Sequence, residues 1–212
     1  MTPDLGGILE AHAGRLLGSL PTGWADRIAA YLDLLHVWNQ RFRLTGDRDE
    51  RRLALHHVAD CVAVAPQIPA GGTFVDIGSG AGLPGIVLAI SRPDVGGTLI
   101  ESRRRPVAFL REACRVLAVD RIRVVEARAE GFAVEPPPWW VPADLAVSRA
   151  LKADAFLELA RPLVHDGGAA VLMRTPAAPA VAIPVGWQAD RIVDYDLPDG
   201  TPRRLQLLRR VC

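Results

Sequence analysis

FVDIGSGAGLPGIVLAIS, residues 74–91, is the stretch that decides the fold. An apolar run ends in an acid, breaks into four glycines and turns apolar again. Gly78, Gly80 and Gly82 form G-x-G-x-G, while Gly80, Gly82 and Gly85 equally form the G-x-G-x-x-G of dinucleotide-binding proteins. Both patterns predict a strand, a loop whose backbone approaches a ligand closely, and a helix that offers its N-terminus to a negative group. The glycines alone leave the ligand open.

Asp76, two positions before the first glycine, separates the two ligand classes. In a dinucleotide site the end of this strand faces pyrophosphate, which a carboxylate would repel. S-adenosyl-L-methionine has no phosphate and carries a cationic amine and a sulfonium, so an acid is favourable beside it. We therefore expect this cofactor, held by Asp76 and by a loop that includes Ser79.

The chain after residue 72 alternates between short apolar runs and helical patterns. Strands are expected at 73–78, 97–102, 122–127, 144–150 and 168–174, with helices near 82–91, 104–118 and 152–164. Strict alternation predicts parallel strands joined by right-handed crossovers. Two strand-like runs around a Pro-Asp-Gly turn in 189–211 indicate a hairpin. The expected fold is α/β, a Rossmann-like class I methyltransferase whose mostly parallel seven-stranded sheet ends in an antiparallel hairpin.

The first 66 residues have a helical pattern instead. An apolar stripe at spacings of three and four predicts a helix from about 22 to 40 with one face in the core; its members are Trp24, Ile28, Tyr31, Leu32, Leu35 and Trp38. A third helix is expected from about 48 to 65, ending before Pro66. We expect residues 1–66 to form a small helical subdomain packed on a methyltransferase domain at 67–212.

Composition excludes several classes of protein. No apolar stretch of about 20 residues is present, and the N-terminus has no basic region leading into an apolar run, so we expect a soluble, cytoplasmic chain without a membrane span. Three separated cysteines favour neither a disulfide framework nor a zinc site. His56 and His57 are adjacent on a helix and point in different directions, so we expect no metal there. One of them is expected to pack between the helical part and the sheet.

Net charge is only +1, but the 24 arginines are unevenly distributed. They cluster at 41–52 and at 103–105, where they could face phosphate. Alternatively, each cluster is a solvated helix face balanced by acids such as Asp47, Asp49 and Glu50.

Further candidate residues follow the later strands. Glu101, at the end of the second strand, could accept hydrogen bonds from both ribose hydroxyls, a role that serves a nicotinamide dinucleotide equally well. Ala129 and Glu130 follow the third strand, where an adenine would be held, although Glu130 could be an ordinary loop residue. Arg149 ends the fourth strand and could hold a phosphate, the cofactor carboxylate or a guanine edge, or form a structural salt bridge.

The end of the fourth strand reads Ser148-Arg149-Ala150, without the Asn/Asp-Pro-Pro-aromatic motif of methyltransferases that act on exocyclic amines. No general base is presented. A ring nitrogen such as guanine N7 already has a free lone pair and loses no proton on methylation, so positioning and electrostatics would suffice.

The chain resembles the bacterial 16S rRNA guanine-N7 methyltransferases, the RsmG or glucose-inhibited division protein B (GidB) family, over nearly its whole length. The resemblance is carried by LHVWNQRFRLT (35–45), HHVADC (56–61), DIGSGAGLPGIVLAISRPD (76–94), RRRPVAFLREACRVL (103–117), RAE (128–130), SRA (148–150) and GGAAVLMR (167–174). In the helical part, the matching positions are Trp38, Asn39, Leu44, Thr45, His57 and Asp60.

The resemblance implies that S-adenosyl-L-methionine is bound at Gly78, Leu83, Ala129, Glu130 and Arg149. It also implies a guanosine of 16S ribosomal RNA, on an assembling small ribosomal subunit, as substrate. We expect Arg149 and Arg174 to contact the RNA or the reacting groups, and the chain to act as a monomer.

Five positions depart from the family pattern. Arg43 replaces Asn, Glu101 replaces Asp, Cys61 replaces Ser, and Arg174-Thr175 replaces Lys-Gly. Arg174 keeps the charge but not the compact ammonium geometry of lysine. Because the chain contains one lysine, coding bias explains that change as well as altered specificity does.

Three other functions remain open on sequence alone. A small-molecule methyltransferase would turn over without RNA, and an NAD-dependent oxidoreductase would bind NADH. A catalytically silent RNA-binding module would bind RNA without transferring a methyl group.

Overall fold

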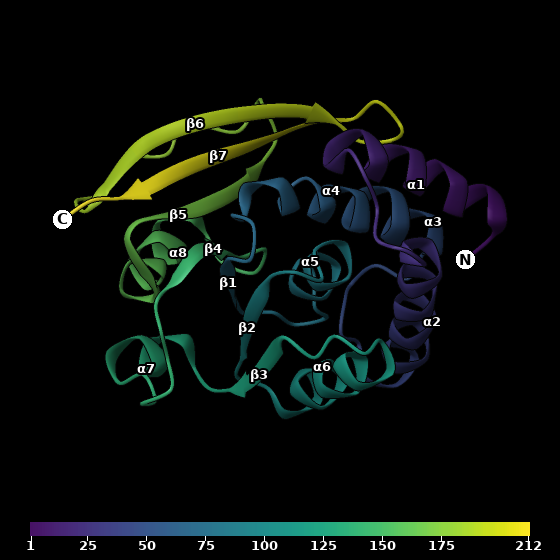
Figure 1. Cartoon of the computed structure of the whole chain (residues 1–212), viewed down its shortest axis with the longest axis horizontal. Helices are drawn as coiled ribbons and strands as arrows, with labels where there is room; N and C mark the ends of the chain where they lie inside the picture. Colours follow the sequence, from purple (N-terminus) through teal and green to yellow (C-terminus); the bar gives the residue numbers. More distant parts are fainter.

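The computed structural model describes residues 1–212 and contains one seven-stranded sheet in the order β3-β2-β1-β4-β5-β7-β6 (Figure 1). Its strands are β1 (Thr73–Ile77), β2 (Gly96–Glu101), β3 (Ile122–Glu126), β4 (Ala143–Val147), β5 (Val164–Arg174), β6 (Trp187–Asp196) and β7 (Pro202–Arg210). The first five strands are parallel, and β7 runs antiparallel to both β5 and β6. The predicted α/β fold and its terminal hairpin are confirmed.

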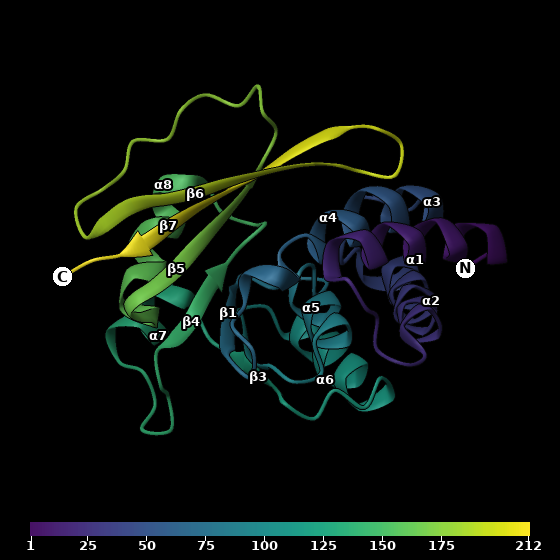
Figure 2. The same cartoon turned by 45° about the horizontal axis from the view of Figure 1, so that its top comes forward.

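Helices cover both faces of the sheet (Figures 1 and 2). They are α1 (Pro3–Leu17), α2 (Trp24–Phe42), α3 (Glu50–Arg52), α4 (Ala59–Val62), α5 (Gly85–Ser91), α6 (Arg104–Val116), α7 (Ala129–Val134) and α8 (Ala153–Ala160). Helices α5 and α6 lie with the N-terminal helices on one side, while α7 and α8 lie on the other. Buried residues on the strands alternate accordingly: Phe74 joins the core under α5 and α6, and its neighbour Val75 joins the core under α7 and α8. Successive side chains of a strand point to opposite faces, so this alternation is expected for a sheet buried on both faces.

The apolar stripe of α2 lies in the larger core. Trp24, Ile28, Tyr31 and Leu35 are 0–1% exposed, and Trp38 is partly buried against the same cluster. Each such side chain contributes about 1.5–3 kcal/mol when it is fully buried. Because this core also contains residues of β1 and α5, the N-terminal helices and the sheet share one apolar interior.

The third helical segment differs in detail from the prediction of 48–65. It begins at Glu50 because the Asp49 side chain accepts a hydrogen bond from the Arg52 N–H (2.7 Å), an N-cap. A π-helical segment, Leu53–Val58, then joins α3 to α4, and the helix ends at Val62. Pro66 lies inside a short 3₁₀ helix, Ala65–Gln67, where its missing N–H costs no helical bond.

In the C-terminal half, α7 was not predicted, and α8 is shorter than the predicted helix. Helix α7 forms directly after β3 and is anchored by Phe132, whose ring packs edge-on against Trp140 (5.1 Å between centroids). The predicted helix at 152–164 stops earlier, because a 3₁₀ turn, Arg161–Leu163, leads straight into β5.

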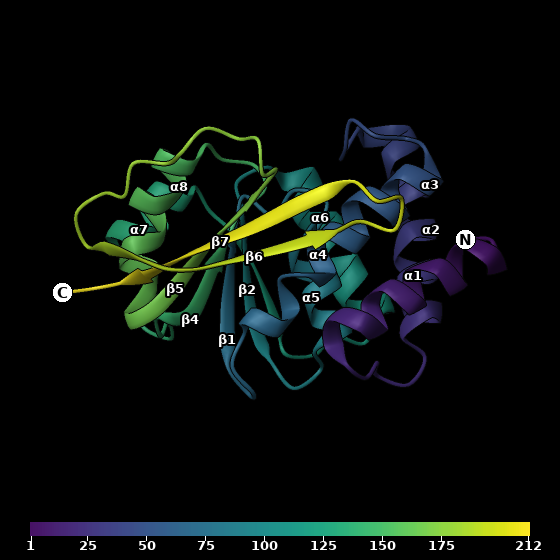
Figure 3. The same ribbon diagram turned by 90° about the horizontal axis from the view of Figure 1, so that it is seen from above.

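Seen from above, the hairpin of β6 and β7 is long enough to pass over α4 toward α1 (Figure 3). No helix is both long and apolar enough to span a bilayer, and no group of three or more His, Cys, Asp or Glu side chains is arranged to hold a metal ion.

Candidate functional site

The glycine loop lies at the carboxyl end of β1. Gly78, Gly80 and Gly82 have φ angles of 76°, 51° and 85°, in the left-handed region that side chains disfavour. The N–H groups of Gly78 and Ser79 both donate to the Ile100 carbonyl, at 2.9 and 3.1 Å, which fastens the loop to the end of β2. The predicted strand, loop and helix therefore occur in order, with the loop backbone at the sheet edge where α/β proteins bind ligands.

Asp76 does not extend into open space but lies under the loop, with 0% of its surface exposed. Its Oδ2 accepts a hydrogen bond from the Gly85 N–H, the first residue of α5, at 3.0 Å. Its Oδ1 is buried and has no hydrogen-bond partner. A methyl group on Gly85 would stand 2.3 Å from Leu99 and 2.7 Å from Asp76, so only glycine allows this approach.

Burial raises the pKa of Asp76 to about 7, and the hydrogen bond from the Gly85 N–H only partly opposes that effect. The Asp76 carboxyl group nevertheless already occupies the N-terminus of α5, through its bond to the Gly85 N–H. A pyrophosphate would need that N-terminus and would meet the carboxylate. This geometry argues against a dinucleotide more strongly than the sequence pattern did. The Ser79 hydroxyl also serves the loop, since it donates to the Asp76 carbonyl at 2.9 Å.

Glu101 lies at the end of β2 and faces a cavity beside the loop. Its Oε2 accepts from the Gly80 N–H (2.9 Å), and its Oε1 accepts from the backbone N–H and Nε of Arg103 (2.9 and 3.1 Å). Oε2 keeps capacity for one more donor. The cavity is lined by Ile77, Gly78, Ile100, Glu101, Ser102, Ala127, Arg128, Ala129, Glu130, Leu151 and Leu159.

That lining brings together four predicted cofactor residues: Gly78, Glu101, Ala129 and Glu130. Ala129 and Glu130 begin α7 rather than lying in a loop. Apolar walls from β1, β2 and α8 with an acid at one end suit a nucleoside, whose base is apolar on its faces and whose ribose donates hydroxyl hydrogens. The residues present therefore fit the adenosine half of S-adenosyl-L-methionine. Leu83 lies apart from this lining, with its side chain partly buried against the core under α5 and α6.

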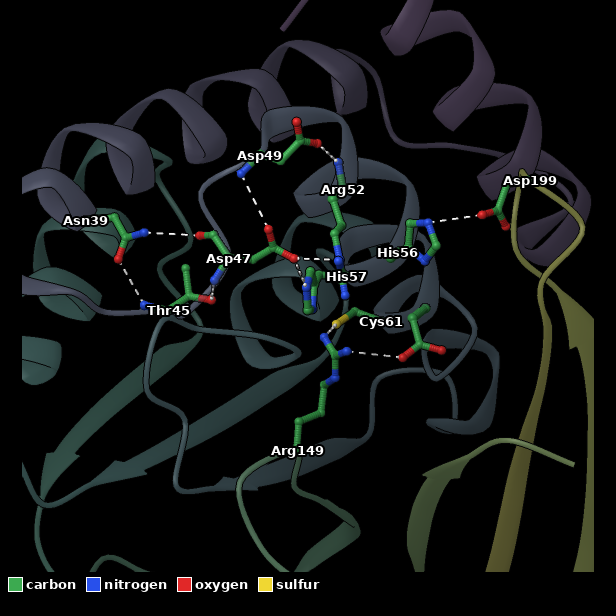
Figure 4. Close-up of polar contacts among 11 residues, drawn as sticks. Asn39, Thr45, Asp47, Asp49, Arg52, His56, His57, Cys61, Arg149 and Asp199 are labelled. Atoms are coloured by element: carbon green, nitrogen blue, oxygen red, sulfur yellow. Dashed lines mark hydrogen bonds and ion pairs between the residues drawn. The ribbon is translucent and has the colours of Figure 1, made fainter. Parts of the chain in front are cut away.

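Arg149 is directed toward the N-terminal helices (Figure 4). Its Nη2 lies 3.3 Å from Asp60 Oδ2, and its Nη1 lies 3.6 Å from Cys61 Sγ. Burial opposes the charged form of Arg149, but contact with Cys61 and Asp60 outweighs it and raises the pKa of the guanidinium. Burial raises the pKa of Cys61 to about 12, so the thiol is neutral. Arg149 thus forms a structural salt bridge with Asp60, one of the roles that the sequence analysis left open.

The polar residues of the N-terminal motifs form a connected scaffold behind Arg149 (Figure 4). Asn39 donates to the Asp47 carbonyl (3.1 Å) and accepts from the Thr45 N–H (3.0 Å), which fixes the loop after α2. Asp47 Oδ2 then lies 3.2 Å from Nε2 of His57. Burial and the charge of Arg149 lower the pKa of His57 below 6.5 despite Asp47, so the ring is neutral at pH 7.

The two adjacent histidines point to different partners, as the helical spacing predicted. His56 Nε2 lies 3.0 Å from Asp199 Oδ2, in the turn between β6 and β7 (Figure 4). His56 therefore links the helical segment to the hairpin, whereas His57 links it to the loop after α2.

The two arginine clusters meet where the end of α2 touches the start of α6. The Arg105 guanidinium stacks over the Phe42 ring, with 5.2 Å between its carbon and the ring centroid, so the start of α6 meets the end of α2. Arg52, Arg103 and Arg104 pair with acids. No salt bridge involves Arg41, Arg43, Arg48, Arg51 or Arg105, all of which are exposed. Each cluster therefore has arginines paired with acids and arginines without an acidic partner, so neither alternative describes it fully.

Arg174 lies at the carboxyl end of β5 and makes local contacts. Its guanidinium donates to Gln206 Oε1 on β7 (2.8 Å) and to the Pro179 carbonyl. It is not brought into contact with Arg149.

Sequence reasoning missed the residues that brace the loop from the N-terminal side. The Tyr31 hydroxyl donates to the Ala81 carbonyl of the loop at 2.7 Å, and Trp24 Nε1 donates to Ser91 Oγ on α5 at 3.0 Å. Both side chains belong to the predicted apolar stripe, and their polar atoms were the only signal of a second role.

The sheet order with its terminal hairpin, and a cavity beside the glycine loop that ends in Glu101, are those of a Rossmann-like class I methyltransferase. The family model of rRNA small subunit methyltransferase G (GidB) matches residues 25–200. The chain belongs to this family of S-adenosyl-L-methionine-dependent enzymes.

Relatives and solved structures agree with this assignment. Ribosomal RNA small subunit methyltransferase G of Xanthomonas oryzae pv. oryzae is 37% identical over 215 residues, covering 99% of this chain and 97% of that protein. The protein of the same name from Neisseria gonorrhoeae is 41% identical over 144 residues, 68% of this chain and 67% of that one. Cofactor-bound Rv0187 from MTB has a TM-score of 0.63 at 20% identity, covering 98% and 96% of the two chains. TrmN from Thermus thermophilus has a TM-score of 0.56 at 20% identity, covering 82% and 53%. These two structures support the fold alone.

Proposed function

We propose that the protein transfers a methyl group from S-adenosyl-L-methionine to N7 of a guanosine in 16S ribosomal RNA. The observation that carries the proposal is Asp76, buried at the N-terminus of α5 beneath the glycine loop, next to a cavity that ends in Glu101. Membership of the family supplies the RNA substrate.

The bound cofactor would supply an electrophilic methyl group on a sulfonium. Glu101 is proposed to accept from the ribose, and Ala129 and Glu130 to border the adenine. The backbone at Gly78, Gly80, Gly82 and Leu83 would follow the rest of the cofactor. Asp76 and Ser79 would act indirectly, because both hold the loop in shape.

No side chain at the end of β4 is placed to remove a proton, which supports an acceptor that loses none. The Ser148 hydroxyl is engaged with the Ile77 carbonyl at 2.7 Å, and Arg149 is cationic. Guanine N7 offers a lone pair, and the chain would need only to align it with the methyl group. Arg149 is proposed to hold the guanine edge or a neighbouring phosphate, and Arg174 the RNA beyond it.

The exposed arginines beside the loop are proposed to contact RNA phosphates. Arg43 and Arg105 have no acidic partner, and Arg105 on α6 stacks over Phe42, the residue before Arg43. Each phosphate contact adds about one to the slope of log affinity against log salt concentration. Replacing both by alanine should therefore lower that slope by about two. Arg115→Ala, which breaks a pair with Glu112 at the far end of α6, serves as the control.

The partner is proposed to be the assembling small subunit, met in the cytoplasm by a monomer. Light scattering of the purified protein tests the monomer directly. A dimer that persists at low concentration would contradict it.

The decisive experiment supplies tritiated S-adenosyl-L-methionine and small-subunit particles from cells that lack the gene. Scintillation counting measures the transfer, and mass spectrometry identifies the methylated nucleotide. The expected result is one guanosine converted to 7-methylguanosine. Label in a small molecule without RNA would favour the small-molecule rival, and RNA binding without transfer would favour a silent module. Calorimetry with NADH against S-adenosylhomocysteine tests the dinucleotide alternative.

A further inference from the structure

Asp60, on α4, is a buried carboxylate that meets groups from two distant parts of the chain. Only 5% of its surface is exposed. Its Oδ2 lies 3.3 Å from Arg149 Nη2, at the end of β4. Its Oδ1 accepts from the Tyr195 hydroxyl at 2.6 Å and lies 3.6 Å from Arg203 Nε, both on the hairpin. One side chain thus joins the N-terminal helices, the glycine-loop side of the sheet and the hairpin.

The charges of this cluster do not balance. One carboxylate faces two guanidiniums, and burial together with Asp60 raises the pKa of Tyr195, which keeps its hydroxyl protonated as a donor. Cys61, the other contact of Arg149, is neutral. Asp60, Arg149 and Arg203 taken together therefore carry a net positive charge, which suits an anionic or electron-rich partner at Arg149.

The two contacts of Arg149 restrict its orientation. A guanidinium is planar, so holding Nη1 and Nη2 at once fixes the plane as well as the position. Ser148, the residue before Arg149, is tied to the end of β1. Its hydroxyl donates to the carbonyl of Ile77, the residue after Asp76. Arg149 is 23% exposed, so part of the guanidinium still faces solvent.

We infer that Asp60 is a positioning residue for methyl transfer, which fixes the Arg149 guanidinium toward the acceptor while the hairpin fixes Asp60 through Tyr195. The inference rests on the proposed function. Asp60 does not touch the reacting groups and acts only through Arg149.

The test compares Asp60→Asn, Arg149→Ala and the double variant in transfer to small-subunit particles. Misplacing a positioning group by about 1 Å costs about 100-fold in rate, so Asp60→Asn should lower kcat about 10- to 100-fold. S-adenosylhomocysteine affinity should change less than about threefold. On the Arg149→Ala background, Asp60→Asn should have no further effect, because residues that act as a unit are not additive.

Three further variants separate a positioning role from a loss of folding. Tyr195→Phe removes one donor to Asp60 without burying a new charge, and should lower kcat about threefold to tenfold if Asp60 needs the hairpin. Asp144→Asn breaks a carboxylate contact with Thr73 and His165 at the opposite end of β4 and should leave turnover unchanged. Asp60→Glu should restore part of the rate.

Three results would overturn the inference: wild-type turnover in Asp60→Asn, an equal loss on both backgrounds, or an Asp144→Asn effect as large as that of Asp60→Asn. If Asp60→Asn fails to fold, an unchanged kcat in Tyr195→Phe overturns the coupling to the hairpin. Absence of transfer by the wild-type protein would instead count against the proposed function.

Discussion

Replacing Asp76 by asparagine isolates the charge of the buried carboxylate. Asparagine has nearly the same shape, and its carbonyl oxygen can still accept from the Gly85 N–H. Its amide NH₂ would lie where Oδ1 has no partner, which costs about 1–3 kcal/mol. The substitution therefore removes a charge and adds one unsatisfied donor.

The magnitude follows from the pKa of Asp76. A native pKa of about 7 against an ordinary 3.8 means that the folded protein binds more protons than the unfolded chain between these values. Stability is accordingly lost as pH rises through that window. At about 1.4 kcal/mol per pH unit, the ionised carboxylate costs the native state about 4 kcal/mol above pH 7. At pH 8, Asp76→Asn should be more stable than wild type by about 1–3 kcal/mol.

The pH dependence is the sharper quantity, because the cost of the amide is the same at every pH. Between pH 8 and pH 5 the advantage of Asp76→Asn should shrink by about 3 kcal/mol. Urea unfolding at pH 5, 6, 7 and 8 measures this change.

Asp94→Asn is a control in which loss of the carboxylate should lower the stability instead of raising it. The pKa of Asp94 is held well below its usual range by the Arg92 guanidinium, so Asp94→Asn should lower stability almost equally at pH 5 and pH 8. If Asp76→Asn and wild type lose stability in parallel across this range, the buried charge is not the cause and the reasoning fails.

Two other predictions concern the loop and the domain boundary. Gly85→Ala should lower stability by about 1–3 kcal/mol and weaken cofactor binding, because its methyl group would meet Leu99 and Asp76, whereas Gly14→Ala, in open space on α1, should be neutral or stabilising in the same thermal melts. We propose that the helical subdomain, residues 1–66, does not fold apart from 67–212; the 67–212 fragment should lack a cooperative melt because it loses the shared core and the Tyr31 bond to Ala81, and a cooperative transition would contradict this.

The parallel strands, the terminal hairpin and the α2 stripe were predictable because each is a periodic apolar pattern. Helix α7 was not, because six residues carry too little pattern and Phe132 finds its partners only in the folded chain. The end of the third helix was predicted at about residue 65, before Pro66, from the local sequence, whereas the helix ends at Val62 and Pro66 lies in a separate 3₁₀ helix.

The sequence by itself determined the class of site: glycines where the backbone must turn left-handed, an acid before them and another at the end of the next strand. Only the tertiary structure decided where the charges point. Asp76 turns under the loop to close α5, and Arg149 turns to Asp60, 89 positions earlier in the chain. Side-chain partners so distant in sequence leave no periodic trace, because burial selects them only once the sheet and helices have packed.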